Sequence, residues 1–510
     1  MKNITNSLLL ALNVAFLLQP VANSQKINTT NNLVVQLETT AAQETPNKDK
    51  TAQKLQIKLA ELNRNRQLIE ADSLYLGGQF AAAEKIYRQV KTPLAQSIEP
   101  KRPEPILDPA NLSPAGKVYW REAQAGKAQN LQTRILVPLR LLVEQYPEFI
   151  PGHLRLAETL KKYDHPKDAL AVLEQASAIY PAQPDLALAK ITTLAEAKKW
   201  MEASLTARQF ALLNYNHPQQ AEFTLIADEN LKRYKSHLRS QLRGNAIANV
   251  ITGALGYAIT GSIFGPISAV QTTAMLLQGE SSVGKSVSKQ ARKQLELVED
   301  PEVVAYVNEI GQKLAVVAGR NDFEYEFYVV MDDNLNAFAL PGGKVFVNAG
   351  AIAKTNSEAE LAGLLAHELS HAVLSHGFQL VAEGNLVANV TQYVPLGNTV
   401  ANLFVLNYSR DMERQADTLG TRLLSSTGYA ADGLLNLMIT LGQQEKNNPP
   451  SWLSSHPATD DRVEYLEKLL VRNQYNRYAY EGVGRHAEIK AKVKKLLVEQ
   501  KQRDEKKRHR

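Results

Sequence analysis

Apolar side chains recur at intervals of three and four residues from about residue 51 to residue 235. This is the spacing of helices that bury one face. Six prolines fall between residues 92 and 114 and interrupt any regular helical array there. Residues 51–235 are therefore predicted to form an all-helical module that contains a proline-rich linker at 92–114.

A period of 34 residues runs through the second part of this module. The segments YPEFIP, YPAQPD and NYNHPQ begin at Tyr146, Tyr180 and Asn214. This period is the length of the tetratricopeptide repeat, in which two close-packed helices stack on their neighbours and form a concave surface. Such a surface favours binding of extended or unfolded polypeptide. A plain helical bundle with a coincidental period is the alternative.

The pattern becomes strand-like at residues 338–347, where apolar and other residues alternate around Pro341-Gly342-Gly343. This alternation predicts a β-hairpin, and the edge of a hairpin can pair with an extended peptide. We expect Leu340, Gly342 and Gly343 to contact substrate there. A peptide that pairs with a strand edge is recognised through its backbone more than through its side chains. This again favours unfolded polypeptide as the substrate.

Residues 1–24 have the order of a secretory signal peptide, with Lys2, an apolar run at 8–18 and small residues before Gln25. We expect export to the periplasm or cell envelope, with residues 25–50 as a flexible polar leader. An uncleaved N-terminal anchor is the alternative.

Residues 244–279 contain no charged side chain but are rich in glycine. Glycine weakens a straight helix, so three interpretations stay open. They are a membrane-dipping hairpin, an amphipathic segment that covers a groove on the protein, and buried core.

Residues 279–286, GESSVGKS, match the phosphate-loop pattern G-x-x-x-x-G-K-[ST]. A phosphate loop needs a buried strand before it and a helix start after it. The preceding AVQTTAMLLQ consists largely of helix formers. We interpret the match as coincidental, as a solvated turn before a helix, and expect no nucleotide.

The composition is that of a globular protein with two or three folded units, since 44% of the 510 residues are hydrophobic and 22% are charged. The formal charge of +6 is modest and does not indicate nucleic acid. Residues 476–510 are predicted to be a basic tail, either a solvated helix end or a contact with an anionic membrane surface. The chain has no cysteine, which excludes disulfides and thiolate chemistry.

The segment LLAHELSHAVLSHG at 364–377 contains the pattern H-E-x-x-H. A capping box formed by Ser357 and Glu360 and an apolar leucine face predict a helix here. On a helix, His367 and His371 lie about 40° apart and can hold one metal ion. Glu368 can then reach a water bound to that ion.

The end of this helix decides the role of the third histidine. Gly377 is placed for a C-terminal stop. On the same helix, His376 would lie about 140° from His371. We therefore predict that His376 is exposed or sits in the C-terminal turn, and that it is not a ligand.

A catalytic zinc ion usually takes three protein ligands and leaves one position for water. The best source of the third ligand is NYSRDMERQADTLGTRLL at 407–424, where Glu413 and Asp417 lie one turn apart beside an apolar stripe. We predict that Glu413 binds zinc and that Asp417 supports a ligand histidine. A solvated acidic helix face is the alternative.

HELSH followed by SRDMERQAD resembles the zinc metallopeptidase family M48, the gluzincins, which include HtpX, BepA and the CAAX prenyl endopeptidases. NAFALPGGKVFVNAGAI at 336–352 is similar to the substrate-edge hairpin of the family, and SSHPATDDR at 454–462 is similar to its late S/T-H-P segment. The resemblance nominates Asn336 to hold the substrate backbone. It nominates His456 as an oxyanion donor or a reversible fourth zinc ligand. By itself, His456 is more typical of a loop histidine.

The resemblance also implies an α+β fold, with the helical module followed by a mainly α metallopeptidase domain with a small β-sheet at 290–475. In BepA-type periplasmic proteases the helical module follows the catalytic domain, whereas here it precedes it. Outer-membrane assembly machinery is a partner only by this resemblance. Peripheral membrane contact would involve 244–279 or the basic tail.

Together these patterns predict an exported endopeptidase with one zinc ion, which hydrolyses unfolded or misfolded envelope proteins. Zinc lowers the pKa of a bound water toward ~7, and Glu368 would accept its proton and pass it to the leaving amine. The alternative is a tetratricopeptide-type chaperone or scaffold whose peptidase site is silent or self-inhibited.

Overall fold

A computed structural model describes residues 48–94, 103–248, 278–382, 394–396, 399–401, 408–445, 452–456 and 460–508. The expected signal peptide at 1–24, nearly all of the leader and most of the uncharged segment at 244–279 lie outside the described residues. The contacts divide the chain into two units. Unit 1 comprises Met1–Pro93 with Tyr478–Gly484, and unit 2 comprises Leu94–Arg477 with Arg485–Arg510.

Unit 1 is built on a helical hairpin of α2 (Lys48–Leu76) and α3 (Phe80–Val90). Between the helices Gly78 has a φ of 75°, which glycine adopts without steric cost. Ala83 and Tyr87 on α3 are fully buried in the core of this hairpin. The hairpin spacing seen in the sequence of residues 71–91 therefore corresponds to two packed helices.

A buried carboxylate ties this hairpin to residues 478–484. Asp72 accepts hydrogen bonds from the Tyr87 hydroxyl at 2.7 Å and from the backbone N–H groups of Glu481 at 2.8 Å and Val483 at 3.0 Å. Burial raises the pKa of Asp72 to about 6. Lys91 forms an ion pair with Glu481 in the same place.

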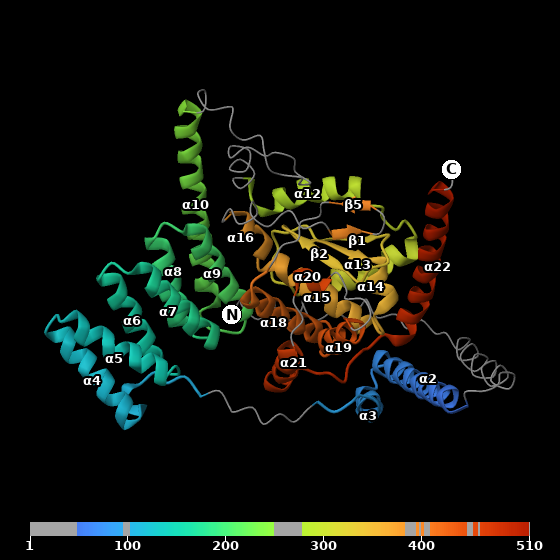
Figure 1. Cartoon of the computed structure of the whole chain (residues 1–510), viewed down its shortest axis with the longest axis horizontal. Helices are drawn as coiled ribbons and strands as arrows, with labels where there is room; N and C mark the ends of the chain where they lie inside the picture. The colour runs from blue at the N-terminus through green and yellow to red at the C-terminus, as the bar shows by residue number, and fades with distance from the viewer. Residues whose placement is uncertain are drawn as a thin grey trace, which may run out of the picture. The chain divides into compact units, whose positions relative to one another are not determined.

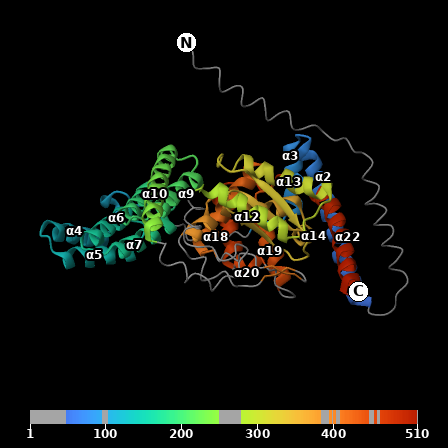
Figure 2. The same cartoon turned by 90° about the horizontal axis from the view of Figure 1, so that it is seen from above.

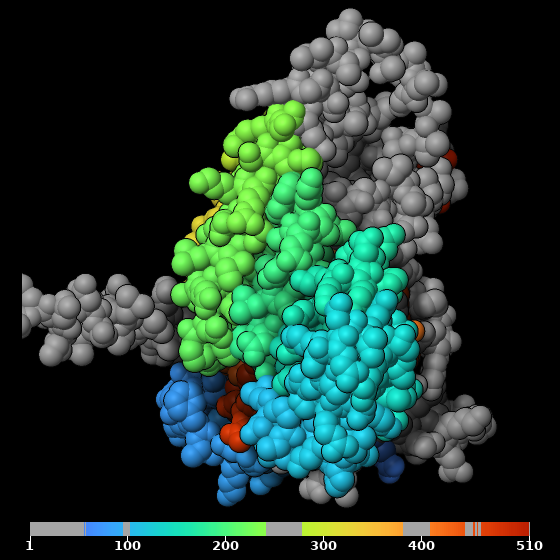
Figure 3. Space-filling model, turned by 90° about the vertical axis from the view of Figure 1, so that its left-hand side faces the viewer, coloured from blue at the N-terminus to red at the C-terminus, as the bar shows by residue number. Residues whose placement is uncertain are grey.

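Unit 2 begins with a succession of antiparallel helices, whose surface Figure 3 shows from cyan to green. They are α4 (Pro114–Ala128), α5 (Gln132–Gln145), α6 (Ile150–Lys162), α7 (Pro166–Ile179), α8 (Pro184–Glu196), α9 (Trp200–Leu213) and α10 (Gln220–Ala248).

The 34-residue period of the sequence is a repeated hairpin. The second helix of each hairpin begins at Gln132, Pro166 and Trp200 in turn. The turns before these helices keep the same period, because the residues with positive φ are Asn130, Asp164 and Lys198. The small buried side chains of Ala169 and Ala203, also one period apart, let neighbouring helices approach closely.

The boundaries of the helical region differ from the expected ones. The structure assigns α2 and α3 to unit 1, whereas α4–α10 belong to unit 2. The contacts thus group α2 and α3 apart from the later helices, and α10 continues to Ala248. The division falls at the proline-rich linker, where proline prevents a continuous helical array.

The remainder of unit 2 surrounds a small three-stranded sheet (Figure 1). Its elements are α12 (Glu280–Gln294), α13 (Pro301–Val316), β1 (Glu326–Val330), β2 (Ala337–Leu340), β3 (Lys344–Asn348), α14 (Ala349–Lys354), α15 (Glu358–Val373), α16 (His376–Ala382), α18 (Arg410–Ser426), α19 (Gly433–Glu445), α20 (Trp452–Ser455), α21 (Asp460–Arg472) and α22 (Val483–Arg508). A short two-stranded ribbon, β4 (Val394–Leu396) and β5 (Thr399–Ala401), completes the described strands.

The strand order is β1-β3-β2, with β3 parallel to β1 and antiparallel to β2. The predicted hairpin at 338–347 is thus present, and its turn uses Gly342 and Gly343 with φ values of 74° and 83°. All five residues of β3 are buried. Both α12 and α15 contact β2 and β3, and in Figure 1 the sheet lies between them. The expected α+β class, with helical hairpins before a mainly α domain that has a small sheet, is confirmed.

The phosphate-loop match lies inside a helix. Gly279 is the N-cap of α12, so residues 280–286 form its first two turns rather than a solvated turn before it. Their backbone N–H groups are turned along the helix and do not line a loop. A Cβ on Gly284 would lie 1.8 Å from the carbonyl oxygen of Pro341, so this glycine serves the contact of α12 with the β2–β3 turn.

The basic C-terminal segment is a packed helix along most of its length. Figures 1 and 2 both show α22 running beside α14. Ile489, Val493 and Leu497 on one face are buried. Lys492 pairs with Glu302 at 2.5 Å and Lys501 with Asp333 at 2.6 Å. Part of the positive charge expected to be solvated or membrane-facing is therefore matched by acidic residues of the same domain.

The length and hydropathy of the described helices bear on membrane crossing. Among these helices, none combines the length and the hydropathy that crossing a bilayer requires.

We predict that Gly363→Ala destabilises the protein. A Cβ at this position on α15 would lie 2.7 Å from the backbone nitrogen of Leu434 on α19, and overpacking of this kind costs about 1–3 kcal/mol. Gly442→Ala on α19 is the matched control, because its Cβ would meet no atom within 4 Å. Alanine there should raise the free energy of unfolding by up to ~1 kcal/mol through helix propensity. Urea unfolding of the two variants measures both effects, and equal effects would contradict the close packing.

A second prediction concerns acid stability. Burial lowers the pKa of His486 on α22 to about 4, and its ring faces the Tyr306 hydroxyl at 2.8 Å and the Thr355 carbonyl at 3.1 Å. In the unfolded chain the pKa of His486 is near 6.5, so the unfolded chain takes up a proton on this ring at a higher pH than the folded chain does. Stability should therefore fall as the pH drops from about 6.5 to 4, by ~2–3 kcal/mol from this group. The His486→Gln variant has no ring to protonate, so the part of the acid-induced fall in unfolding free energy that comes from His486 should be absent. Urea unfolding at pH 7 and 4.5 tests this, and an equal loss in both proteins would refute it.

Candidate metal centre

The helix α15 begins where the sequence predicts it. The Ser357 hydroxyl accepts a hydrogen bond from the Glu360 N–H at 3.1 Å, and the Glu360 carboxylate accepts one from the Asn356 N–H at 2.8 Å. The expected capping box is thus present, with its reciprocal bond going to Asn356. Every residue of α15 is buried. A helix that is buried on all sides can carry polar side chains only where hydrogen-bond or charge partners compensate for the loss of water.

The end of α15 differs from the expected one. The helix stops at Val373, and Ser375 takes a φ of 60° before α16 begins at His376. Gly377 is therefore inside the next helix rather than at a C-terminal stop. The prediction that His376 is exposed or sits in the C-terminal turn is wrong, because its exposed fraction is 0% and it is the first residue of α16. Its angular position on α15 does not apply once the chain turns at Ser375.

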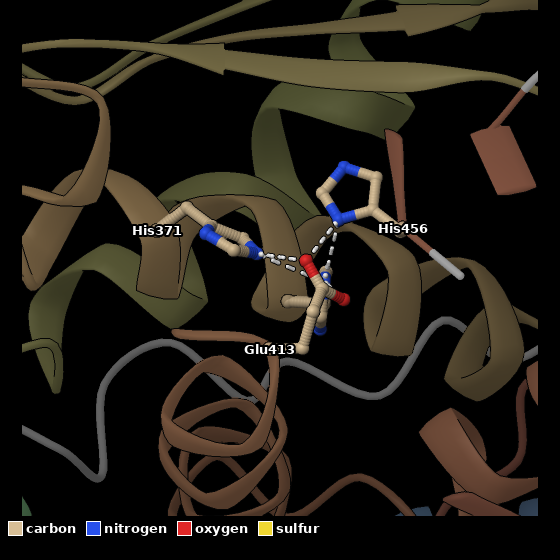
Figure 4. Close-up of side chains that lie close together, drawn as sticks. His371, Glu413 and His456 are labelled. Carbon is tan, nitrogen blue, oxygen red and sulfur yellow. Dashed lines mark hydrogen bonds and ion pairs between the residues drawn. The ribbon is translucent and has the colours of Figure 1, made fainter. Parts of the chain in front are cut away.

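Four buried side chains converge beside α15. Ligand atoms of His367, His371, Glu413 and His456 all lie within 4.8 Å of one another. The Nε2 atoms of His367 and His371 are 3.1 Å apart. Glu413 on α18 approaches all three rings: Oε1 lies 2.8 Å from His456 Nδ1 and 3.4 Å from His371 Nε2, and Oε2 lies 3.5 Å from His367 Nε2. Figure 4 shows His371, Glu413 and His456 pointing toward one another.

The close approach of α15 and α18 depends on a small residue. Gly420 lies on α18, and a Cβ there would come within 3.2 Å of the backbone nitrogen of His367. A larger residue would force the two helices slightly apart, and Glu413 lies on the helix that would move.

The ring nitrogen of His367 that points away from the cluster, Nδ1, contacts the carboxylate of Asp417, which in turn pairs with the guanidinium of Arg462. Asp417 Oδ1 lies 2.9 Å from His367 Nδ1 and accepts the hydrogen of this nitrogen, which leaves Nε2 as the ring nitrogen that faces the cluster. Arg462 on α21 donates to both oxygens of Asp417, from Nε at 3.0 Å and Nη2 at 2.7 Å. It also pairs with Glu413 at 3.1 Å. The two buried carboxylates thus share one buried cation.

The pKa shifts follow these contacts. Burial alone would raise the pKa of Glu413, but His456 and the other two histidines lower it well below its usual range. Burial opposes ionisation of Asp417 too, and Arg462 and His367 lower its pKa. Burial lowers the pKa of His371 well below its usual value. For His367, the effect of burial is outweighed by hydrogen bonds to Asp417 and Glu413, which raise its pKa to about 9.

Glu368 is fully buried at the same centre. The indole N–H of Trp452 donates to its Oε1 at 2.6 Å, and His456 Nε2 lies 3.4 Å from the same oxygen. The other oxygen, Oε2, is buried without a hydrogen-bond partner among the described residues. Glu368 is therefore fixed on one side and keeps an acceptor available on the other.

His456 follows directly after α20 and is 1% exposed. Its ring stacks on Trp452 with centroids 4.5 Å apart. The His371 ring stacks on Tyr408 at 3.8 Å. Two aromatic rings thus hold two of the imidazoles in place.

The donor set fits zinc. Imidazole nitrogens and a carboxylate oxygen are ligand types that zinc takes, typically four around one ion. When His367 is neutral, its Nδ1–H donates to Asp417 and its Nε2 turns a lone pair toward two further imidazole nitrogens and a carboxylate. A bound cation would then take the place of the proton that Asp417 and Glu413 otherwise stabilise on this ring. A divalent cation is the partner that satisfies such converging lone pairs.

The residues expected to bind substrate lie on the sheet. Asn336 directly precedes β2 and is 8% exposed; its carbonyl accepts a hydrogen bond from the Asn348 N–H at 2.9 Å. β2 is an edge strand of the described three-stranded sheet. Leu340 is in the core, and a Cβ on Gly342 or Gly343 would meet Ser281 at 2.9 Å or the Tyr325 ring at 2.6 Å. The two glycines thus have a packing role. Within the described part of the chain, no hydrogen bond or ion pair joins these four residues to the cluster of histidines and Glu413.

Several residues at the centre are not evident from the sequence. Arg462 lies in the SSHPATDDR segment, and the need of two buried acids for a cation could have indicated it. Trp452 and Tyr408 carry no local signal. His376 and its neighbour Gln415 depend on where α15 ends, which the sequence pattern misplaces.

Comparison with known proteins agrees with this geometry. Residues 301–470 match the model of peptidase family M48. The chain is 27% identical over 205 residues to the beta-barrel assembly-enhancing protease of Yersinia pestis, which covers 36% of this chain and 42% of that protein. It is 30% identical over 183 residues to the mitochondrial metalloendopeptidase OMA1 of Schizosaccharomyces pombe, covering 34% and 54%. The OMA1 of Arabidopsis thaliana is 29% identical over 279 residues, covering 52% and 54%.

The chain spans about half the length of the curated relatives it matches. The family match includes α13–α15, the sheet, α18 and His456, which is the whole of the cluster described above.

We predict that Asp417→Asn weakens zinc binding by about 10- to 100-fold, the usual effect of losing the partner that orients a ligand histidine. Asp411→Asn, an exposed acid on the same helix, is the matched control and should leave affinity unchanged. Competition with a chromophoric chelator measures both. Identical affinities for wild type and Asp417→Asn would show that this carboxylate does not support the site.

Proposed function

We propose that this chain, in which residues 301–470 form a domain of peptidase family M48, is a zinc-dependent endopeptidase that acts on unfolded polypeptide. His367, His371 and Glu413 are its zinc ligands, Glu368 is its general base and acid, and His456 is either a fourth ligand or an oxyanion donor. Asp417 orients His367. The observation that carries the proposal is the convergence of these four donor groups within 4.8 Å, next to a buried glutamate.

Bound zinc would supply a Lewis acid and lower the pKa of a coordinated water toward ~7. The residues of the chain supply the proton transfers. Oε2 of Glu368 has no partner among the described residues, so it is available to accept a proton from the attacking water. The Trp452 N–H holds Oε1 and keeps the carboxylate in one orientation. Glu368 then returns the proton to the leaving amine, which completes the hydrolysis.

The environment of Glu413 supports its role as a ligand. Its carboxylate is 5% exposed and its pKa is lowered, so it is ionised at neutral pH. Arg462 keeps part of this charge balanced. A ligand that is already ionised and oriented loses little freedom when it binds a cation.

Substrate would bind as an extended strand along β2. An edge strand presents unpaired backbone N–H and C=O groups, and such groups bind an extended peptide by adding a strand. Asn336, at the start of β2, would hold the substrate backbone at the end of that strand. Recognition of this kind requires unfolded polypeptide, because folded proteins rarely expose extended backbone.

We further propose that the protein acts in the cell envelope on misfolded proteins. The sequence of residues 1–24 supports export. The similarity to a relative called a beta-barrel assembly-enhancing protease supports envelope substrates and contact with outer-membrane assembly machinery. The hairpins α4–α9, with their 34-residue period, would deliver extended segments to the domain.

We predict that Glu368→Gln abolishes cleavage of unfolded casein, because glutamine cannot accept the proton. Zinc content should stay near one per chain, because Glu368 is not a ligand in this scheme. Glu464→Gln, on the exposed face of α21, is the matched control and should cleave normally. Cleavage is followed by gel electrophoresis and zinc by atomic absorption. Undiminished cleavage by Glu368→Gln would rule out this mechanism.

A self-inhibited peptidase is the second candidate. His367, Glu368, His371, Glu413 and His456 are all buried, and His456 lies between Glu413 and Glu368, where water and a substrate carbonyl would need to enter. In that case the wild type would capture unfolded protein without cutting it, and Glu368→Gln would change nothing. His456→Ala would then increase cleavage rather than reduce it.

A further inference from the structure

The buried His376 has a partner on each ring nitrogen. Its Nδ1 lies 3.0 Å from Nδ1 of His371, and its Nε2 lies 2.9 Å from the side-chain oxygen Oε1 of Gln415. Gln415 lies on α18, two residues after Glu413. A row of groups therefore runs from Gln415 through His376 to a proposed zinc ligand.

The chemistry of each group fixes the direction of the hydrogen bonds. An amide oxygen only accepts, so His376 Nε2 carries a hydrogen and donates it. A neutral imidazole has one N–H, so His376 Nδ1 is then an acceptor. His371 Nδ1 must donate to it, and this leaves His371 Nε2 with a lone pair. That nitrogen is the one that faces Glu413 and His367.

We propose that His376 and Gln415 are positioning residues that hold His371 in the tautomer and ring orientation needed to bind the metal ion. This inference rests on the proposed zinc site. It gives each ligand histidine of α15 a separate support: the carboxylate of Asp417 for His367, and the neutral relay through His376 for His371.

The turn that brings His376 back to His371 is itself held in place. Arg320 donates from Nη1 to the Val373 carbonyl and to the Ser375 hydroxyl, both at 3.1 Å. The Ser375 hydroxyl donates to Glu280 at 2.6 Å. One of these bonds is made to the last residue of α15 and the others to Ser375. They stabilise the positive φ of Ser375, a conformation that costs a non-glycine residue energy. These contacts of the fold therefore set the position at which His376 begins α16.

Without the relay, the buried Nδ1–H of His371 would lose its acceptor, and the ring could turn or exchange tautomers. Either change removes the Nε2 lone pair from the centre for part of the time. We expect the zinc affinity to fall by about 10- to 100-fold, as for other partners of ligand histidines.

Two substitutions at His376 distinguish the hydrogen bond that His376 accepts from His371 from the space that the His376 ring fills. His376→Phe keeps an aromatic ring but has no acceptor. His376→Asn places its side-chain oxygen near the position of Nδ1 and can accept from His371. Zinc dissociation constants of the full-length chain, measured by chelator competition, should rise about 10- to 100-fold in His376→Phe. In His376→Asn they should stay within a few-fold of wild type.

Gln415 tests the direction of the relay. Gln415→Glu offers only acceptors and should keep zinc affinity close to that of wild type, whereas Gln415→Met offers no comparable acceptor and should weaken it. Gln415 is half-buried, so both variants should fold even if a variant at His376 does not. Thermal melting of the zinc-free proteins checks that the loss of affinity is not a loss of fold.

The outcomes are distinct. Wild-type affinity in both His376→Phe and Gln415→Met, with one zinc ion per chain, would overturn the relay and leave the proposed function standing. Weaker binding in Gln415→Glu than in Gln415→Met would overturn the stated direction of the hydrogen bonds. A wild-type protein that holds no zinc would overturn the proposed function and this inference with it.

Discussion

The carboxylate of Glu413 is the point on which the rest of the centre depends. It lies 2.8–3.5 Å from nitrogens of three buried imidazoles and 3.1 Å from a buried guanidinium. An isolated carboxylate in this environment would be strongly disfavoured, because removal of a charge from water costs several kcal/mol unless partners compensate. The partners come from α15, from His456 directly after α20 and from α21, so the ionised state of Glu413 requires that all of these parts are assembled.

The surrounding fold is organised to keep those partners in place. Gly420 lets α18 approach the backbone of His367, and Gly363 lets α19 approach α15 at Leu434. Each of the three polar side chains at the centre of α15 has its own hydrogen-bond partner: Asp417 for His367, Trp452 for Glu368 and His376 for His371. A buried helix with this many polar residues is stable only because each has a specific partner.

The sequence predicted those parts that depend on local spacing. The helix of H-E-x-x-H, its capping box, the hairpin around Gly342 and Gly343 and the 34-residue helical repeat follow from periodicity and turn chemistry, and the structure contains them. Glu413 and Asp417 could be nominated because they lie one turn apart, and the structure brings both to the histidines. Their roles as ligand and support remain predictions.

The sequence did not predict those parts that depend on distant contacts. The helix α15 ends four residues before Gly377 because Arg320 and Glu280, from other elements, hold a turn at Ser375. The misplaced end made His376 look exposed. Similarly, the phosphate-loop letters at 279–286 lie in a helix because that segment packs on the β2–β3 turn, and the basic C-terminal segment packs because its apolar face meets the domain.

The central claim is that the ligand atoms gathered by α15 and α18 bind one zinc ion. X-ray absorption at the zinc edge of the purified full-length protein tests it most directly. The account predicts one zinc ion per chain with only nitrogen and oxygen neighbours at about 2.0–2.2 Å. It also predicts outer-shell scattering from at least two imidazole rings. A protein that retains no zinc after purification and reconstitution, or whose zinc shows no imidazole scattering, would contradict the account.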